Sequence, residues 1–303
     1  GFNIDSYTLP EIIDSSDLRP TMWAELCQII LKNYEKYCGF VILHGTDTMA
    51  YSASALSFML SNLTKPVIFT GSQLPIGTIR TDGRENLIAA IEIAAATIEE
   101  KAVVPEVCIL FGDKLFRGNR TTKVNAESFD AFQSFNYPPL AEIGIHIHYN
   151  YGAIDYSPRT APVEAFTGMN THIATLKLFP GIRMELIDAI IRCPGLQGLI
   201  LETYGSGNAP TAESFLNKIK EAAEKGILLY NVTQCQGGSV EMGRYETSRE
   251  LVTCEVISGY DITTEAAVCK MMYLLEKYKD ANEIKKYLNS SIRGEITLNR
   301  IGF

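Results

Sequence analysis

A hydroxyl and a carboxylate lie between two apolar segments, at a position that suits ligand chemistry. Phe40 to Leu43 is a short apolar run that predicts a buried parallel strand. Thr48 to Leu60 is rich in Ala, Leu and Met and predicts a packed helix. Thr46 and Asp47 stand between them, where a ligand would meet both side chains and the positive end of the helix. Asp47 also has a simpler interpretation as the cap of that helix, and both interpretations stay open here.

A second candidate is the segment from Lys114 to Asn125, which is basic in an otherwise acidic protein. Arg117, Arg120 and Lys123 lie close to a glycine within it, as expected of a loop that reaches toward an anion or a carboxylate. The alternative interpretation is a solvated surface loop.

Two other polar groups have structural interpretations. Asp14, Ser15, Ser16 and Asp17 precede a helix predicted from about residue 21 to 37, and four small polar residues there are typical of a capping loop. His146 and His148 alternate along a strand-like run, and no cysteine or carboxylate spacing near them favours a metal site. We therefore predict that the protein holds no metal.

The elements that must position these residues repeat the order strand, glycine, loop, helix. Lys65 to Gly71 and Val107 to Gly112 are buried strands that each end in glycine, and a helix is predicted from Glu85 to about Ile98. Such repeats predict an α/β fold with a doubly wound, flavodoxin-like sheet. The loops then collect at the carboxyl edge of the strands, where such folds bind ligands.

The pattern changes after Gly144, where prolines and short alternating runs replace the repeated units. We predict a larger N-terminal domain over 1–150, a linker over 151–167 and a smaller α/β domain over 168–303. The smaller domain is expected to contain strands at 171–178, 196–203 and 227–233 and helices at 214–224 and 263–277. Within it, Gly205-Ser-Gly-Asn208 lacks the third glycine of a dinucleotide fingerprint, so we predict a sharp turn and no nucleotide cofactor.

Composition excludes several classes of function. The 303 residues carry a net charge of −8 without a basic block, which argues against a nucleic-acid partner or an acidic membrane surface. No apolar run approaches the roughly 20 residues of a membrane span. Seven scattered cysteines without a C-x-x-C pair indicate reduced thiols in a cytoplasmic protein.

Several motifs taken together resemble a known family. His44-Gly-Thr-Asp-Thr-Met-Ala-Tyr-Ser-Ala-Ser-Ala-Leu56 is similar to the second signature of the bacterial-type L-asparaginases, and most closely to their cytosolic type I branch. Further family segments follow in the expected order and spacing: Asp14 to Asp17, Thr70 to Gln73, Arg117 to Lys123, Tyr204 to Pro210, and Thr233 to Cys235. The resemblance implies an amidohydrolase that converts L-asparagine to L-aspartate and ammonia without a cofactor. It also implies a homotetramer built as a dimer of dimers.

The resemblance implies roles for particular residues. Thr46, Asp47 and Lys123 match the family's threonine–aspartate–lysine relay, in which the hydroxyl acts on a water and the ammonium stabilises the oxyanion. Asp47 is expected to pair with the α-ammonium of the substrate. Asp14, Ser15 and Ser16 match the loop that holds the amino-acid head group.

Two departures from the family pattern lead to further expectations. The first signature, Thr-Gly-Gly-Thr, carries the nucleophilic threonine and is not among these residues. The resemblance places it a few tens of residues before Gly1, so a polypeptide limited to this sequence is expected to lack asparaginase activity. Glu202 replaces an arginine of the allosteric type I enzymes, and its carboxylate would repel the effector's carboxylate. We therefore predict no allosteric activation by asparagine.

Two alternative functions stay open. The amidase subunit of a tRNA-dependent amidotransferase shares this pair of domains, and a non-catalytic amino-acid-binding module would keep only the head-group site. The acidic charge argues against tRNA contact. The sequence does not determine a preference for asparagine over glutamine.

Overall fold

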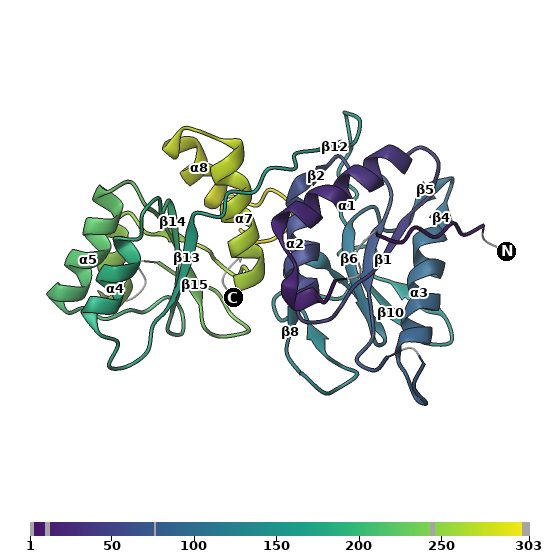
Figure 1. Ribbon diagram of the computed structural model, residues 1–303, viewed down its shortest axis with the longest axis horizontal. Coiled ribbons are helices and arrows are strands. Elements are labelled where there is room, and N and C mark those ends of the chain that lie inside the picture. The colour runs from purple at the N-terminus through teal and green to yellow at the C-terminus, as the bar shows by residue number, and fades with distance from the viewer. Residues whose placement is uncertain (1–2, 10–12, 76, 243–245, 299–303) are drawn as a thin grey trace. The chain divides into compact units, whose positions relative to one another are not determined.

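The structure is a computed structural model that describes residues 3–9, 13–75, 77–242 and 246–298. The protein divides into two compact units, Gly1–Thr167 and Gly168–Phe303. Each unit combines helices with its own parallel or mixed sheet (Figure 1). The predicted α/β class, with a larger first sheet and a smaller second one, is confirmed. Residues 3–9 have no regular secondary structure.

The first unit is built on a sheet of six described strands in the order β1-β3-β6-β7-β10-β11. Its parallel part pairs β1 (Phe40–Leu43) with β3 (Val67–Thr70), and β3 with β6 (Val107–Phe111). Every residue of β3 and β6 is buried, as expected for parallel strands covered on both faces. The antiparallel part adds β7 (Lys114–Arg117), β10 (Ala141–Ile143) and β11 (Ile147–Tyr149).

Helices cover both faces of this sheet. α2 (Met49–Met59) lies on one side and α3 (Gly83–Ala95) on the other, while α1 (Pro20–Asn33) packs on α2 (Figure 1). Nearly every residue of α2 is buried, because the helix is apolar or small on all sides. The turn between β1 and α2, which carries Thr46 and Asp47, is therefore supported by rigid elements before and after it.

The basic segment predicted as a loop is mostly structured and buried. It contains β7, the 3-10 helix η2 (Gly118–Arg120) and β8 (Thr122–Lys123), which pairs with β9 (Phe132–Gln133). The Nε of Arg117 lies 2.5 Å from Oε2 of Glu106, and the guanidinium of Arg120 lies 5.1 Å from the centre of the Tyr137 ring. Arg117 thus pairs with a carboxylate of the protein itself, and the alternative of a solvated surface loop is wrong for both arginines, since both are buried.

Short pairings complete the first unit. β4 (Thr97–Ile98) pairs with β5 (Lys101–Ala102), and β2 (Leu60–Ser61) pairs with β12 (Glu164–Ala165). Residues 151–167, predicted as a linker, thus lie in the first unit and lay a strand along β2.

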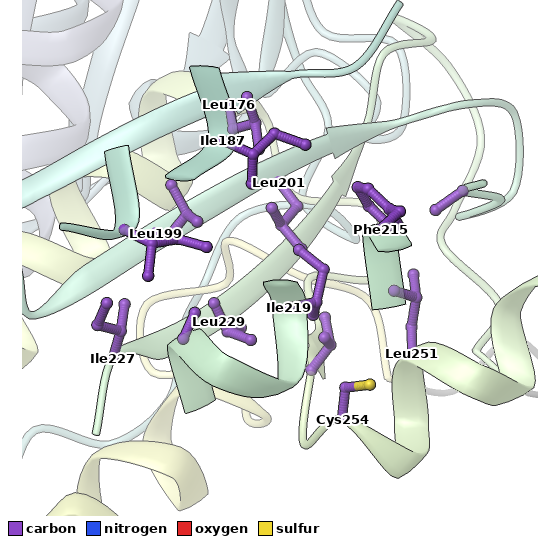
Figure 2. Close-up of a cluster of buried hydrophobic side chains, with 14 of the residues drawn as sticks. Leu176, Ile187, Leu199, Leu201, Phe215, Ile219, Ile227, Leu229, Leu251 and Cys254 are labelled. Carbon is purple, nitrogen blue, oxygen red and sulfur yellow. The ribbon is translucent and has the colours of Figure 1, made fainter. Parts of the chain in front are cut away.

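The second unit has a parallel sheet in the order β13 (Ile173–Lys177), β14 (Gly198–Thr203), β15 (Leu228–Thr233) and β16 (Ile257–Ser258). Its core fills the space between the sheet and α4 (Met184–Ile191), α5 (Glu213–Glu224) and α6 (Glu246–Thr253), as Figure 2 shows. Cys254 packs in this core as a small apolar residue. The predicted turn after β14 is present, with Gly205 and Gly207 at positive φ.

Two further helices, α7 (Thr264–Lys277) and α8 (Ala281–Leu288), complete this unit. Met271, Tyr273 and Leu274 of α7 are buried within the single polypeptide. A buried ion pair joins α7 to the segment after α8, since Nζ of Lys270 lies 2.7 Å from Oε1 of Glu295 and both side chains are fully buried. The Lys270 ammonium also donates to the carbonyls of Leu288 and Ser290.

Candidate active site

The turn after β1 is held at the carboxyl edge of the sheet. The backbone N–H of His44 donates to the carbonyl of Thr70 at 2.9 Å and so continues the parallel ladder beyond the strand. Gly45 has no room for a larger residue, because a Cβ there would lie 2.5 Å from Oγ of Ser15. The hydroxyl of Thr48 donates to the carbonyl of Ser15 at 2.7 Å. The turn is therefore packed against the loop at residues 13–17.

That loop forms the short 3-10 helix η1 (Ser15–Asp17), which Asp14 caps. Oδ1 of Asp14 accepts hydrogen bonds from the backbone N–H and the hydroxyl of Ser16, and these bonds hold the pKa of Asp14 below its ordinary value. The following helix α1 has Pro20 at its first position and is not capped by any side-chain hydrogen bond, so the loop caps η1 and not α1. Asp14 and Ser16 are exposed beside the turn, whereas Ser15 is buried beneath it.

Lys123 reaches the turn from β8. Its Nζ lies 2.7 Å from Oγ1 of Thr46 and 2.7 Å from Oδ1 of Asp47. The lysine side chain is 18% exposed and the Asp47 side chain 64% exposed. The ammonium is thus partly withdrawn from water, while the carboxylate faces solvent and is open to a second cation.

The hydrogen of the Thr46 hydroxyl has a defined direction. A lysine ammonium can only donate, so the Thr46 oxygen accepts from Lys123 and its own hydrogen must point elsewhere. Oε1 of Gln73 lies 3.2 Å from the Thr46 oxygen, and Nε2 of Gln73 donates to the carbonyl of Ser128 at 3.0 Å. The backbone N–H of Gln73 donates to both carboxylate oxygens of Asp82 at 3.0 Å. The remaining lone pair of Thr46 is therefore the group presented to a ligand.

Gln73 is a residue of this site that the sequence did not predict. It lies in the Thr70–Gln73 segment used for the family resemblance, so its position could have been found there. The role of its side chain could not be found there, because the amide forms hydrogen bonds with Thr46 and Ser128, which are 27 and 55 positions away in the sequence.

The predicted residues of the first unit thus lie together on three loops at one edge of the sheet. Thr46, Asp47 and Lys123 are in direct contact, and Asp14, Ser15 and Ser16 flank them. Among the described residues, no group of three His, Cys, Asp or Glu side chains could hold a metal ion. His146 and His148 are exposed on or beside β11. The arrangement offers a carboxylate for a cationic group and a polarised hydroxyl beside an ammonium.

Glu202 lies in the second unit, at the carboxyl end of β14. Its Oε2 is 3.8 Å from Nζ of Lys177, and its side chain is 15% exposed. Its backbone carbonyl accepts from Nε2 of Gln234. The expectation that Glu202 prevents allosteric activation remains a prediction.

Comparisons with known proteins extend over almost the whole sequence. Residues 3–155 match the family model described as asparaginase, N-terminal, and residues 172–288 match that of the glutaminase/asparaginase C-terminal domain. L-asparaginase 1 of Escherichia coli K12 is 44% identical over 297 residues, which are 98% of this chain and 85% of that protein. The 60 kDa lysophospholipase of Mus musculus is 42% identical over 296 residues, which are 96% of this chain and 51% of that protein. The crystal structure of L-asparaginase I from Vibrio cholerae is 42% identical and covers 95% of this chain and 84% of its own, with a TM-score of 0.87.

Proposed function

This chain belongs to the asparaginase family, and we propose on that premise that it is an L-asparagine amidohydrolase. The observation that carries the proposal is the contact of one ammonium, that of Lys123, with both Thr46 and Asp47 at 2.7 Å. The reaction consumes one water, breaks the carbon–nitrogen bond of the asparagine side-chain amide and releases L-aspartate and ammonia.

We assign substrate binding to Asp47 and the head-group loop. The Asp47 carboxylate is exposed and suits the α-ammonium of an amino acid. Asp14 and Ser16 lie exposed on η1 and its cap, with Ser15 beneath the turn, and hydroxyl and backbone donors of this loop suit the α-carboxylate. Gripping both charges of the amino acid would direct its side-chain amide toward Thr46.

We assign the chemical steps around Thr46 to the hydroxyl and the ammonium. The free lone pair of Thr46 can accept a hydrogen bond from a water and so position it, and the Lys123 ammonium stabilises negative charge that develops beside the Thr46 oxygen. The attacking threonine of the family's Thr-Gly-Gly-Thr segment stays a prediction, since none of the 303 residues belongs to that motif.

Ammonia release by the full-length protein tests the activity. We expect release from L-asparagine without tRNA or any partner protein, and loss of release in Lys123→Met. Release that requires tRNA would favour the amidotransferase subunit instead. Tight binding of aspartate without any release would favour the non-catalytic binding module.

We further propose that the protein is a cytoplasmic homo-oligomer, a tetramer by family resemblance. All seven cysteines are free thiols, which suits a reducing compartment. No helix within the described part of the protein is long and apolar enough to cross a bilayer. Met271, Tyr273 and Leu274 of α7 are buried within one polypeptide, so they do not support an interface between copies of the protein. Light scattering of the full-length protein tests the assembly, and a monomer at micromolar concentration would contradict it.

A further inference from the structure

A series of hydrogen bonds runs beneath the Thr46–Asp47 turn and is not used by the mechanism above. Nε1 of Trp23, on α1, lies 2.9 Å from Oγ of Ser52, on α2. Oγ of Ser52 lies 2.8 Å from Nε2 of His44, the residue that follows β1. Nδ1 of His44 lies 2.6 Å from the carbonyl oxygen of Gly45. This relay, from Trp23 through Ser52 and His44 to Gly45, therefore connects two helices to the backbone of the turn.

The chemistry of its two ends fixes the direction of the two outer bonds. The indole N–H of Trp23 can only donate, and the carbonyl of Gly45 can only accept. Nδ1 of His44 must therefore carry a hydrogen, and the oxygen of Ser52 must accept from Trp23. The hydroxyl of Ser52 is then left to donate to Nε2 of His44. In this arrangement all four groups are satisfied with His44 neutral and protonated at Nδ1, so that Nε2 is an acceptor.

The surroundings of His44 favour the same state. Trp23 and Ser52 are buried, and the Phe69 ring of β3 stands nearly edge-on to the imidazole at 5.7 Å. Burial lowers the pKa of His44, while the hydrogen bond to the Gly45 carbonyl raises it. A protonated ring would lose the hydrogen bond that the Ser52 hydroxyl donates to Nε2, and the Ser52 hydrogen would then need another acceptor.

Three charged groups of the adjoining loops, those of Asp47, Lys123 and Asp14, have partners of their own. The Asp47 carboxylate pairs with the Lys123 ammonium, and the Asp14 carboxylate accepts from Ser16. Ser52 of α2 and Phe69 of β3, which contact the imidazole, are uncharged, as is Trp23 of α1 behind Ser52. The state of His44 is therefore set by the direction of its hydrogen bonds and by burial.

The relay acts on the turn through one peptide group. The carbonyl of Gly45 is held by His44, and the α-carbon of the same residue is confined by Ser15, which a Cβ would meet at 2.5 Å. Thr46 and Asp47 follow directly. A rotation of the Gly45 peptide would move the Thr46 hydroxyl relative to the Lys123 ammonium, and small displacements of reacting groups cost much of the rate.

We propose that His44 is a positioning residue, held as the neutral Nδ1–H tautomer by donation from Trp23 through Ser52, and that it fixes the Thr46–Asp47 turn for turnover. The predicted effect on turnover rests on the proposed hydrolase function, whereas the predicted tautomer of His44 does not. The tautomer can be observed whether or not the protein hydrolyses asparagine.

Imidazole ¹⁵N–¹H correlation spectra of the labelled full-length protein test the tautomer. The sequence has four histidines, of which His146, His148 and His172 are exposed and supply reference signals, and His44→Asn assigns the remaining signal. We expect a hydrogen on Nδ1 of His44 and an accepting Nε2. A hydrogen on Nε2 at neutral pH would overturn the proposal.

Two serines on the same helix provide a matched pair for the kinetic test. Ser52→Ala breaks the relay, whereas Ser57→Ala removes a buried hydroxyl that donates to the carbonyl of Ser54. We expect Ser52→Ala to lower kcat about five- to tenfold with KM and aspartate affinity unchanged, as for one lost hydrogen bond that positions the reacting groups. Ser57→Ala should leave kcat unchanged, and Ser52→Thr should restore most of it.

Trp23→Phe tests how the relay affects the pKa of His44 and the pH dependence of kcat. The indole N–H polarises the Ser52 hydroxyl, so without it the hydrogen bond that Ser52 donates to the neutral ring is weaker and the pKa of His44 should rise. We expect the acid limb of the kcat profile to move to higher pH by the same amount as the His44 signal. An unchanged His44 titration and profile in Trp23→Phe, or equal kinetic losses in Ser52→Ala and Ser57→Ala, would refute the positioning role.

Discussion

Replacing Asp47 and Lys123 one at a time should separate binding from turnover. Lys123→Met keeps the apolar stem and removes the ammonium that contacts the Thr46 hydroxyl at 2.7 Å. Asp47→Ala removes the exposed carboxylate that we assign to the substrate's α-ammonium. Because the two residues contact each other, the structure also predicts how the loss of Lys123 affects the binding of aspartate by Asp47.

The expected loss of turnover in Lys123→Met follows from its distance to Thr46. Removing one preorganised group that stabilises developing negative charge typically lowers kcat by about 10²–10³-fold. Binding of aspartate should not weaken. The Lys123–Asp47 pair is partly exposed and worth only about 0–1 kcal/mol, so freeing Asp47 should tighten the Kd by at most about fivefold.

Asp47→Ala, unlike Lys123→Met, is expected to weaken the binding of aspartate. A charge-assisted hydrogen bond contributes about 1.5–3 kcal/mol, and the exposure of Asp47 favours the lower part of that range. The Kd for aspartate should therefore rise by at least about tenfold. In the full-length protein, calorimetric titration with L-aspartate measures binding and ammonia release measures turnover.

Lys114→Met is a suitable control, because Lys114 also pairs with an aspartate but lies on β7 outside the site. It should leave both quantities unchanged. Parental affinity for aspartate in Asp47→Ala would refute the binding role. Turnover within about threefold of the parent in Lys123→Met would refute the role of the ammonium, since a loss of about 10²-fold or more is expected.

Three further predictions concern neighbouring and distant groups. Gln73→Met removes the acceptor of the Thr46 hydroxyl, so kcat should fall about fivefold at an unchanged aspartate Kd. Lys270→Met leaves the Glu295 carboxylate buried without its partner, and should destabilise the second unit by about 3–5 kcal/mol in urea unfolding. The pKa of Asp155 is lowered to about 2 by hydrogen bonds that outweigh burial, so its stabilisation is present above about pH 4 and is lost toward pH 2. The gap in Tm between the parent and Asp155→Asn should close over that interval.

Each of these predictions has a result that contradicts it. Parental kcat in Gln73→Met would show that the hydroxyl direction does not matter. The double variant Lys270→Met, Glu295→Gln should recover part of the lost stability, and equal loss in the single and double variants would contradict the ion-pair argument. A Tm gap for Asp155→Asn that stays constant between about pH 4 and 2 would exclude the assigned linkage.

The sequence alone determined the elements whose pattern is local. The buried strands at 67–70, 107–111 and 228–233 are short apolar runs, and α5 and α7 follow the helical period, so their positions agree with the sequence to within a few residues. It also placed Thr46 and Asp47 between β1 and α2, because strand, turn and helix are contiguous. The similarity to asparaginases could likewise be recognised from motifs in the sequence.

Only the tertiary structure decided which polar residues meet. Lys123 is 77 positions from Thr46 in the sequence. The basic segment alone does not indicate which of its cations, Arg117, Arg120 or Lys123, reaches the site. The antiparallel pairing of β7 with β6 buries Arg117 against Glu106, and Arg120 lies against the Tyr137 ring, whereas Lys123 contacts the Thr46–Asp47 turn. The same limit applies to the relay from Trp23 through Ser52 to His44. Its members lie on three elements, and the direction of its bonds is fixed by partners that packing brings together and sequence spacing does not encode.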